Sequence, residues 1–160
     1  MRGLRLIVLI ACALVAASAG ARADIKSYAI VQDDASLLMR GKTIRLAGIF
    51  IPSTGQICNT NIRPVRCAPR AAQALEFIIR GFVHCQEQGR FSDGSLSAFC
   101  WVGRSSFSEG RDLGAYLISQ GWAMARPDGP FEYQALEDIA RSRGVGLWGF
   151  QADDIRRRKP

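Results

Sequence analysis

The chain has 160 residues, of which 48% are hydrophobic and 22% are charged, and its formal net charge is +7. This length suits one domain with a core of its own and argues against a second domain. The sequence contains no internal repeat, which excludes a repeat architecture.

Residues 1–23 have the pattern of a secretory signal peptide. The basic start Met1–Arg5 precedes an apolar stretch from Leu6 to Ala19, and Ala21-Arg22-Ala23 is a small-x-small cleavage signal. We therefore expect export to the periplasm or the extracellular space. The apolar stretch is shorter than the roughly 20 residues of a membrane-spanning helix, so we expect no transmembrane segment in the mature chain. A lipoprotein cleavage box at Leu9–Cys12 is the minor alternative, because it lies too early in the apolar stretch.

The expected mature chain, residues 24–160, is a single domain with a basic tail at residues 155–160. Loss of Arg2, Arg5 and Arg22 lowers the formal charge from +7 to +4. The charge therefore supports nucleic-acid binding less than the whole-chain value suggests. A basic tail of this kind indicates a solvated chain end rather than a binding site, although it adds a nonspecific attraction for anions.

The cysteines after the signal peptide predict disulfides. They are Cys58, Cys67, Cys85 and Cys100, an even number in an oxidising compartment. Of the three connectivities, we favour the sequence-local pairs Cys58–Cys67 and Cys85–Cys100. A metal site is disfavoured because no C-x-x-C occurs and the single histidine, His84, directly precedes Cys85.

Short apolar runs predict a β-meander at the start of the mature chain. The runs are Ser27–Val31, Ser36–Met39 and Thr43–Ile51, with a turn at residues 40–42 and Pro52 as the stop. A polar loop, Ser53–Pro69, follows.

Helices and strands alternate in the rest of the chain. Apolar residues at helical spacing predict a helix over Arg70–Phe82, with Ala72, Leu75, Ile79 and Phe82 on one face. The expected elements that follow are strands Val83–Gln88 and Leu96–Val102, a loop Gly103–Gly110, a helix Asp112–Gln120 that stops at Gly121, an extended piece Trp122–Ala125 and a helix Phe131–Arg143. On the helix over residues 131–143, Tyr133, Leu136, Ile139 and Ala140 are expected to face inward. Five strands and three helices in this order predict an α+β domain built on a small β-barrel.

Four segments together resemble the staphylococcal nuclease (thermonuclease-like) family. They are Thr43-Ile-Arg-Leu-Ala-Gly-Ile49 followed by Pro52, Cys67-Ala-Pro-Arg-Ala-Ala-Gln-Ala-Leu75, Arg111-Asp-Leu-Gly-Ala-Tyr-Leu-Ile-Ser-Gln-Gly-Trp-Ala123, and Glu137-Asp-Ile-Ala-Arg-Ser-Arg-Gly-Val-Gly-Leu-Trp148. They cover nearly the whole mature chain in the family's order. The resemblance implies a five-stranded oligonucleotide/oligosaccharide-binding (OB) barrel with three helices. It also implies an ancestry in calcium-dependent cleavage of DNA and RNA.

The residues that the family uses for this chemistry are mostly replaced. The resemblance places its two metal-binding aspartates at Ala35 and Phe50, and its glutamate near the attacking water at Ser53. Of its two phosphate-binding arginines, one is kept as Arg45 and the other falls on Ser95. Calcium needs six to eight oxygen ligands, and phosphoryl transfer needs its charge stabilised. We therefore expect no calcium cofactor and no calcium-dependent cleavage, although Asp33 and Asp34 flank the lost ligand position.

Aromatic residues stand where the family has acidic ones. Phe50 and Phe91 have two interpretations: rings that fill the vacated cleft as core, which is the favoured one, or a platform on which a ligand stacks. Arg45 is either a phosphate or carboxylate binder or a structural partner of a buried acid. The favoured function is a noncatalytic binding or assembly module, with nucleic acid or an envelope protein as candidate partners. A nuclease with a rebuilt site and a structural accessory of an envelope protein are the alternatives.

Overall fold

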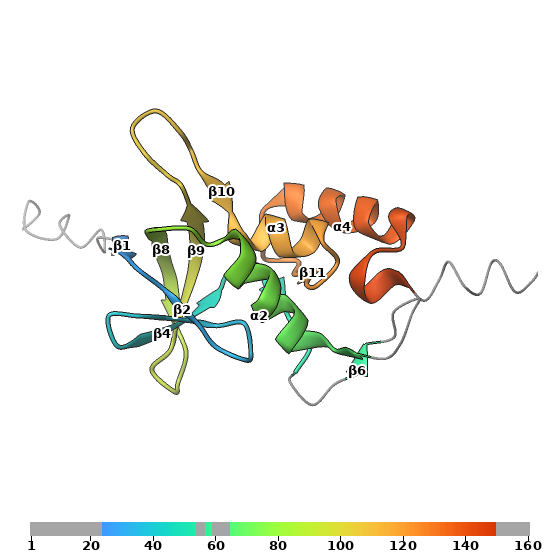
Figure 1. Cartoon of the computed structure of the whole chain (residues 1–160), viewed down its shortest axis with the longest axis horizontal. Coiled ribbons are helices and arrows are strands. Elements are labelled where there is room, and N and C mark those ends of the chain that lie inside the picture. The colour runs from blue at the N-terminus through green and yellow to red at the C-terminus, as the bar shows by residue number, and fades with distance from the viewer. Residues whose placement is uncertain (1–23, 54–56, 59–64, 150–160) are drawn as a thin grey trace, which may run out of the picture.

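The computed structural model describes residues 24–53, 57–58 and 65–149. Seven of the described strands form one sheet that curls into half a barrel (Figure 1). They are β1 (Asp24–Ser27), β2 (Ile30–Val31), β3 (Leu37–Met39), β4 (Lys42–Leu46), β8 (Val83–Arg90), β9 (Leu96–Val102) and β10 (Arg111–Asp112). The order is β1-β8-β9-β4-β3-β2, with β10 also paired to β9. Only the β4–β9 pair is parallel among these neighbours.

Two pairs of short strands lie outside this sheet. β5 (Ile49–Phe50) pairs with β11 (Met124–Ala125), and β6 (Ile57–Cys58) pairs with β7 (Val65–Arg66). The α+β class is confirmed, and the curled sheet with three α-helices in the described chain is compatible with an OB-like fold. The expected number of five strands is not confirmed, because several expected strands are divided into shorter ones.

Gly48 divides the longest expected strand. The run predicted over Thr43–Ile51 becomes β4 and β5, and Gly48 between them has φ +71°. A Cβ atom there would lie 2.9 Å from the Cα of Gly129, so both the backbone conformation and the close approach require glycine. The turn directs β5 away from the main sheet and toward β11, which places residues 49–53 beside the loop that follows β11.

The rest of the predicted meander is confirmed with different boundaries. β2, β3 and β4 are antiparallel neighbours in sequence order. The first predicted run, Ser27–Val31, is divided between β1, which pairs with β8, and β2, which pairs with β3. The β8–β9 hairpin agrees with its prediction, although β8 extends to Arg90.

The first described helix, α2 (Cys67–Ile78), differs from the predicted Arg70–Phe82 at both ends. Pro69 lies in its first turn, where proline is tolerated because the amide there lacks an intrahelical acceptor. At the other end, Ile79 has left the helical conformation, with ψ of 110°. Phe82 is therefore not on the inner face of the helix. Its ring instead stacks on Tyr28, with 4.3 Å between the ring centroids.

The other two helices follow their predictions closely. α3 (Leu113–Ser119) begins after Asp112, whose carboxylate accepts a hydrogen bond from the amide of Ala115. α4 (Phe131–Arg143) packs against α3 at one end of the sheet (Figure 1). The contact is close because Gly114 has no side chain. A Cβ atom on Gly114 would lie 2.6 Å from the hydroxyl of Tyr133, which donates to Asp112 at 2.8 Å. A single turn of 3-10 helix, η1 (Gly146–Trp148), follows α4.

The core lies between the inner face of the sheet and the helices. Side chains along β9 alternate, so that Leu96, Ala98, Cys100 and Val102 are buried. On α4 the prediction is partly wrong: Tyr133 and Ala140 are buried, but Ile139 is exposed and Glu137 is buried instead. Glu137 is tolerated there because its carboxylate accepts from the amide of Ala125 at 2.6 Å and from the guanidinium of Arg141.

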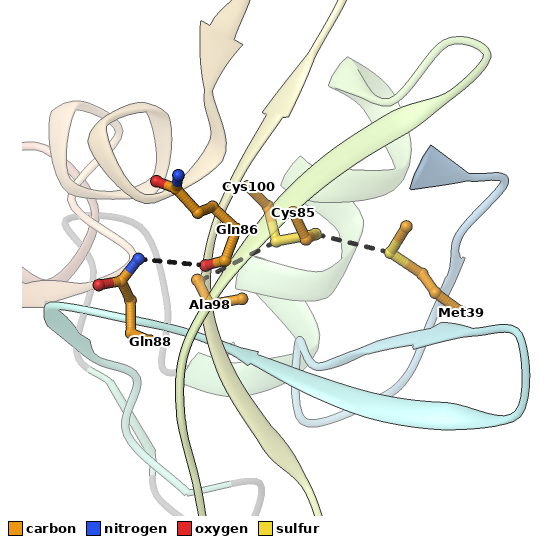
Figure 2. The surroundings of a disulfide bond; sticks show 6 residues. All are labelled: Met39, Cys85, Gln86, Gln88, Ala98 and Cys100. Atoms are coloured by element: carbon orange, nitrogen blue, oxygen red, sulfur yellow. Dashed lines mark hydrogen bonds between the residues drawn. A yellow bond between two sulfur atoms is a disulfide. The ribbon is translucent and has the colours of Figure 1, made fainter. Parts of the chain in front are cut away.

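The disulfide Cys85–Cys100 joins β8 to β9 and confirms that predicted pair (Figure 2). The two cysteines face each other directly in the antiparallel register and are buried, with the sulfur of Met39 3.6 Å from that of Cys85. Cys67 is also disulfide-bonded. The side chain of its expected partner, Cys58, lies outside the described residues, so this second pair stays a prediction.

Among the described residues, no helix combines the length and the apolar composition needed to cross a membrane.

Candidate functional site

One cleft brings together most of the residues that the sequence singled out. Its volume is about 450 Å³. Its described lining comes from the turn before β3, from β4, from the segment that follows Gly48, from the start of α2, and from the loops after β8 and β11. The lining residues are Asp34, Ala35, Ser36, Arg45, Leu46, Ile49, Phe50, Ile51, Pro52, Ser53, Ala68, Phe91 and Arg126. Ala35, Arg45, Phe50, Ser53 and Phe91 therefore share one site, although up to 56 residues separate them in the chain.

Arg45 reaches the cleft from the outer face of β4. Its neighbours Ile44 and Leu46 point into the core, so strand alternation turns the Arg45 side chain outward. The guanidinium carbon lies 5.0 Å from the centroid of the Phe91 ring, within the range of a cation–π contact. One of its nitrogens, Nη2, donates to Oδ2 of Asp93 at 2.7 Å. Arg45 thus has an exposed acidic partner, which contradicts the alternative of a buried acid.

Asp93 is held in place by the turn that joins β8 to β9. Its Oδ1 accepts from the hydroxyl of Ser95 at 2.6 Å and from the amide of Ser95 at 2.9 Å. Gly94 completes the turn with φ +81°. The two hydrogen bonds from Ser95, followed by the charge of Arg45, lower the pKa of Asp93. The carboxylate is therefore ionised and oriented toward Arg45 at neutral pH.

The rings of Phe50 and Phe91 are partly open to solvent. Phe50 is 48% exposed and Phe91 is 43% exposed, and neither belongs to the core cluster. The favoured interpretation of these rings as core is therefore wrong. Phe50 is directed outward because it alternates with the buried Ile49 on β5, which pairs with β11. Two half-exposed aromatic rings thus line a cleft that also contains a guanidinium group.

The described lining of the cleft contains few acidic groups. Asp34 is the one acidic residue in the described lining, and its Oδ1 accepts both the amide and the hydroxyl of Ser36. Ala35 is buried and has φ +62°, a left-handed conformation that is uncommon for alanine. Within the described ranges, no three His, Cys, Asp or Glu side chains gather where they would hold a metal ion.

Three residues considered from sequence lie outside the described lining. Ser95 is buried beneath the turn, where its hydroxyl bonds to Asp93. Trp101 and His84 face each other across the β8–β9 pair, and Arg104 rather than a cleft residue stacks on the Trp101 ring.

Two residues near the cleft were missed by the sequence analysis. Arg126 follows β11, and its amide donates to the carbonyl of Gly48 at 2.9 Å. No local signal marks it, because its place depends on the pairing of β5 with β11. Asp93 was visible only as part of a Ser-Asp-Gly turn, a pattern that predicts a turn but no long-range partner.

No family model matches the chain. It is similar to a probable endonuclease. That protein is "Probable endonuclease LCL3" of Podospora anserina, which is 26% identical over 133 residues. The match covers 71% of this chain and 44% of the relative, so the chain spans less than half of the relative's length. This similarity supports a nuclease-like relationship at the level of the family, in agreement with the motifs in the sequence.

Proposed function

We propose that this chain is an exported nuclease-like domain that binds single-stranded nucleic acid in the cleft and does not cleave it with calcium. The observation that carries the proposal is the presence of Arg45 and the half-exposed rings of Phe50 and Phe91 in one cleft. Single-strand-binding barrels combine these two elements, since guanidinium groups attract phosphates and aromatic rings stack on bases of any sequence. The buried disulfide Cys85–Cys100 is compatible with export.

The ion pair between Arg45 and Asp93 does not prevent phosphate binding. The two side chains are 47% and 49% exposed, and ion pairs of this kind contribute about 0–1 kcal/mol. Loss of the Asp93 partner therefore costs little, and a phosphate would offer Arg45 an equivalent charge-assisted hydrogen bond. Phe91 stays under the guanidinium and is available as a stacking surface beside it.

The side chains in the cleft do not fit the calcium chemistry of the family. The side chains of Ala35 and Phe50 offer no oxygen atoms where the resemblance implies the metal-binding aspartates, and both hydrogen bonds from Ser36 go to one oxygen of Asp34, Oδ1. Ser53 stands where a general base is expected, and a neutral hydroxyl is a poor base at pH 7. We therefore assign the cleft to binding and derive no hydrolytic step.

The similarity to a probable endonuclease favours one second candidate, which is phosphodiester hydrolysis by a rebuilt site. Asp34 would be its acidic residue, since it is the one carboxylate in the described lining. Cleavage of the bound strand separates this candidate from a binding module.

The test uses the mature chain and a 5′-labelled oligothymidylate of about ten nucleotides, a length within the range that one OB domain covers. Fluorescence anisotropy measures binding in calcium and in chelator, and a denaturing gel reports the length of the probe. We expect binding that does not depend on calcium, a probe of unchanged length, and about tenfold weaker binding by Arg45→Ala. Arg104→Ala is the matched control, because Arg104 also stacks on a ring, that of Trp101, but lies outside the described lining.

Failure of the wild-type protein to bind would overturn the proposal. Cleavage that Arg45→Ala abolishes would replace it with the nuclease candidate.

A further inference from the structure

Arg126 lies in the lining of the same cleft as Arg45 but comes from a different part of the fold. Arg45 belongs to the main sheet, whereas Arg126 follows β11, where backbone hydrogen bonds fix the position of its main chain. Its amide donates to Gly48, and the preceding amide, that of Ala125, donates to the buried carboxylate of Glu137 at 2.6 Å. The backbone at residues 125 and 126 is therefore anchored to two other segments of the fold, while the Arg126 side chain itself is exposed.

The two arginines share a second feature. Each has one exposed aspartate as its ion-pair partner, Asp93 for Arg45 and Asp128 for Arg126 at 3.0 Å. Asp128 lies two residues after Arg126, and its hydrogen bond from the guanidinium lowers the pKa of Asp128. An exposed pair of this kind weakens the binding of a competing anion by about fivefold at most. Both guanidinium groups are thus paired in the free protein and available to a stronger anion.

The charges and the aromatic rings of the lining suit a ligand with more than one phosphate. The described lining holds two arginines and one aspartate, and that aspartate, Asp34, accepts from Ser36. The half-exposed rings of Phe50 and Phe91 line the same cleft as the two arginines. A nucleic-acid strand repeats a phosphate and a base at each step, so a single strand can contact both cations while its bases stack on the rings.

We infer that Arg126 is a second phosphate-binding residue of the cleft, and that Asp93 and Asp128 occupy the guanidinium groups of Arg45 and Arg126 until the strand displaces them. This inference rests on the proposed binding function. It assigns to Arg126 a role that position 95, now a buried serine, can no longer fill. It also makes a strand with successive phosphates a better ligand than a single phosphate group.

The test compares Arg126→Ala with Arg104→Ala in the oligothymidylate binding assay, across a range of salt concentrations. The slope of log K against log salt is negative, and loss of one phosphate contact on a single strand decreases its magnitude by about 0.7. We expect this decrease for Arg126→Ala, with about tenfold weaker binding at low salt, and no decrease for Arg104→Ala. Asp128→Asn keeps Arg126 and removes its competitor, so binding should tighten by up to about fivefold.

The outcomes distinguish a failure of the role of Arg126 from a failure of the proposed function. If Arg45→Ala weakens binding and Arg126→Ala behaves like Arg104→Ala, the role of Arg126 is refuted while the proposed function stands. Weaker binding by Asp128→Asn would also refute the role of Arg126, since it would mean that Asp128 supports the ligand site rather than competing for it. If the wild-type protein does not bind the probe, the proposed function fails, and the role of Arg126 fails with it.

Discussion

Replacing Phe50 by alanine should weaken ligand binding and should cost the fold less than the truncation of a fully buried phenylalanine would. A fully buried phenylalanine costs about 3–5 kcal/mol when it is truncated to alanine. Because 48% of Phe50 is already exposed, and the ring borders an open cleft rather than a closed core, we expect a cost of about 1–2 kcal/mol. A stacked base is worth about 1–3 kcal/mol by the same truncation, which is roughly a 5- to 150-fold loss of affinity.

Two measurements test this expectation. Urea unfolding of the mature domain gives the change in the free energy of unfolding, and anisotropy of the labelled oligothymidylate gives the change in affinity. Phe107→Ala is the matched control, because Phe107 is 99% exposed in the turn between Ser105 and Ser108 and does not line the cleft. It should change neither quantity.

Two results would refute the reasoning. A loss of stability above about 3 kcal/mol for Phe50→Ala would mean that the ring acts as core despite its exposure. An affinity equal to that of Phe107→Ala would mean that no base stacks on Phe50.

Three further predictions concern stability and metal binding. Cys100→Ser should lower the free energy of unfolding by about 2–5 kcal/mol, and an unchanged urea midpoint would contradict a structural role for its disulfide. Burial, and then the charge of Asp112, raises the pKa of Tyr133, so the folded phenol stays neutral while the unfolded one ionises. Wild-type stability should therefore fall as pH rises above about 10. The variant Tyr133→Phe should be about 1–3 kcal/mol less stable than the wild type at pH 7. In melting experiments it should lack this part of the decline in stability at alkaline pH. The double variant Ala35→Asp with Phe50→Asp should gain weak calcium affinity by calorimetry, because it supplies two carboxylates in one cleft and aspartate tolerates the left-handed conformation of residue 35 better than most residues. A folded double variant without a calcium response would show that position 35 is not the former ligand position.

Much of the second half of the fold could be predicted from the sequence, because its signals are local. The strands over residues 83–88 and 96–102 were predicted as neighbours, and the structure joins them in a hairpin bridged by the predicted pair Cys85–Cys100. The helix predicted to stop at Gly121 ends at Ser119, just before this left-handed glycine, and the helix predicted over residues 131–143 has those bounds. These features depend on residues within one turn or one hairpin, so residues that are close in the sequence are enough to specify them.

The composition of the cleft was only partly predictable. The motif comparison proposed that Ala35, Arg45, Phe50 and Ser53 lie near one another, and the structure places all four in one lining. The exposure of the Phe50 ring was not predictable, because it depends on β5 leaving the main sheet at Gly48. The burial of Glu137 in place of Ile139 depends in the same way on the backbone amide of Ala125, which belongs to another element.

Which charged side chains meet around the cleft was decided by the tertiary structure alone. Arg45 and Asp93 are 48 residues apart, and they meet because β4 lies parallel to β9 beside the turn that carries Asp93. Arg126 reaches the cleft because β11 pairs with β5. The sequence by itself determined which residues favour strands, caps and turns, since those preferences arise within a few bonds of each residue. Which side chains meet across the cleft depends on how distant segments pack, and that is a property of the folded chain as a whole.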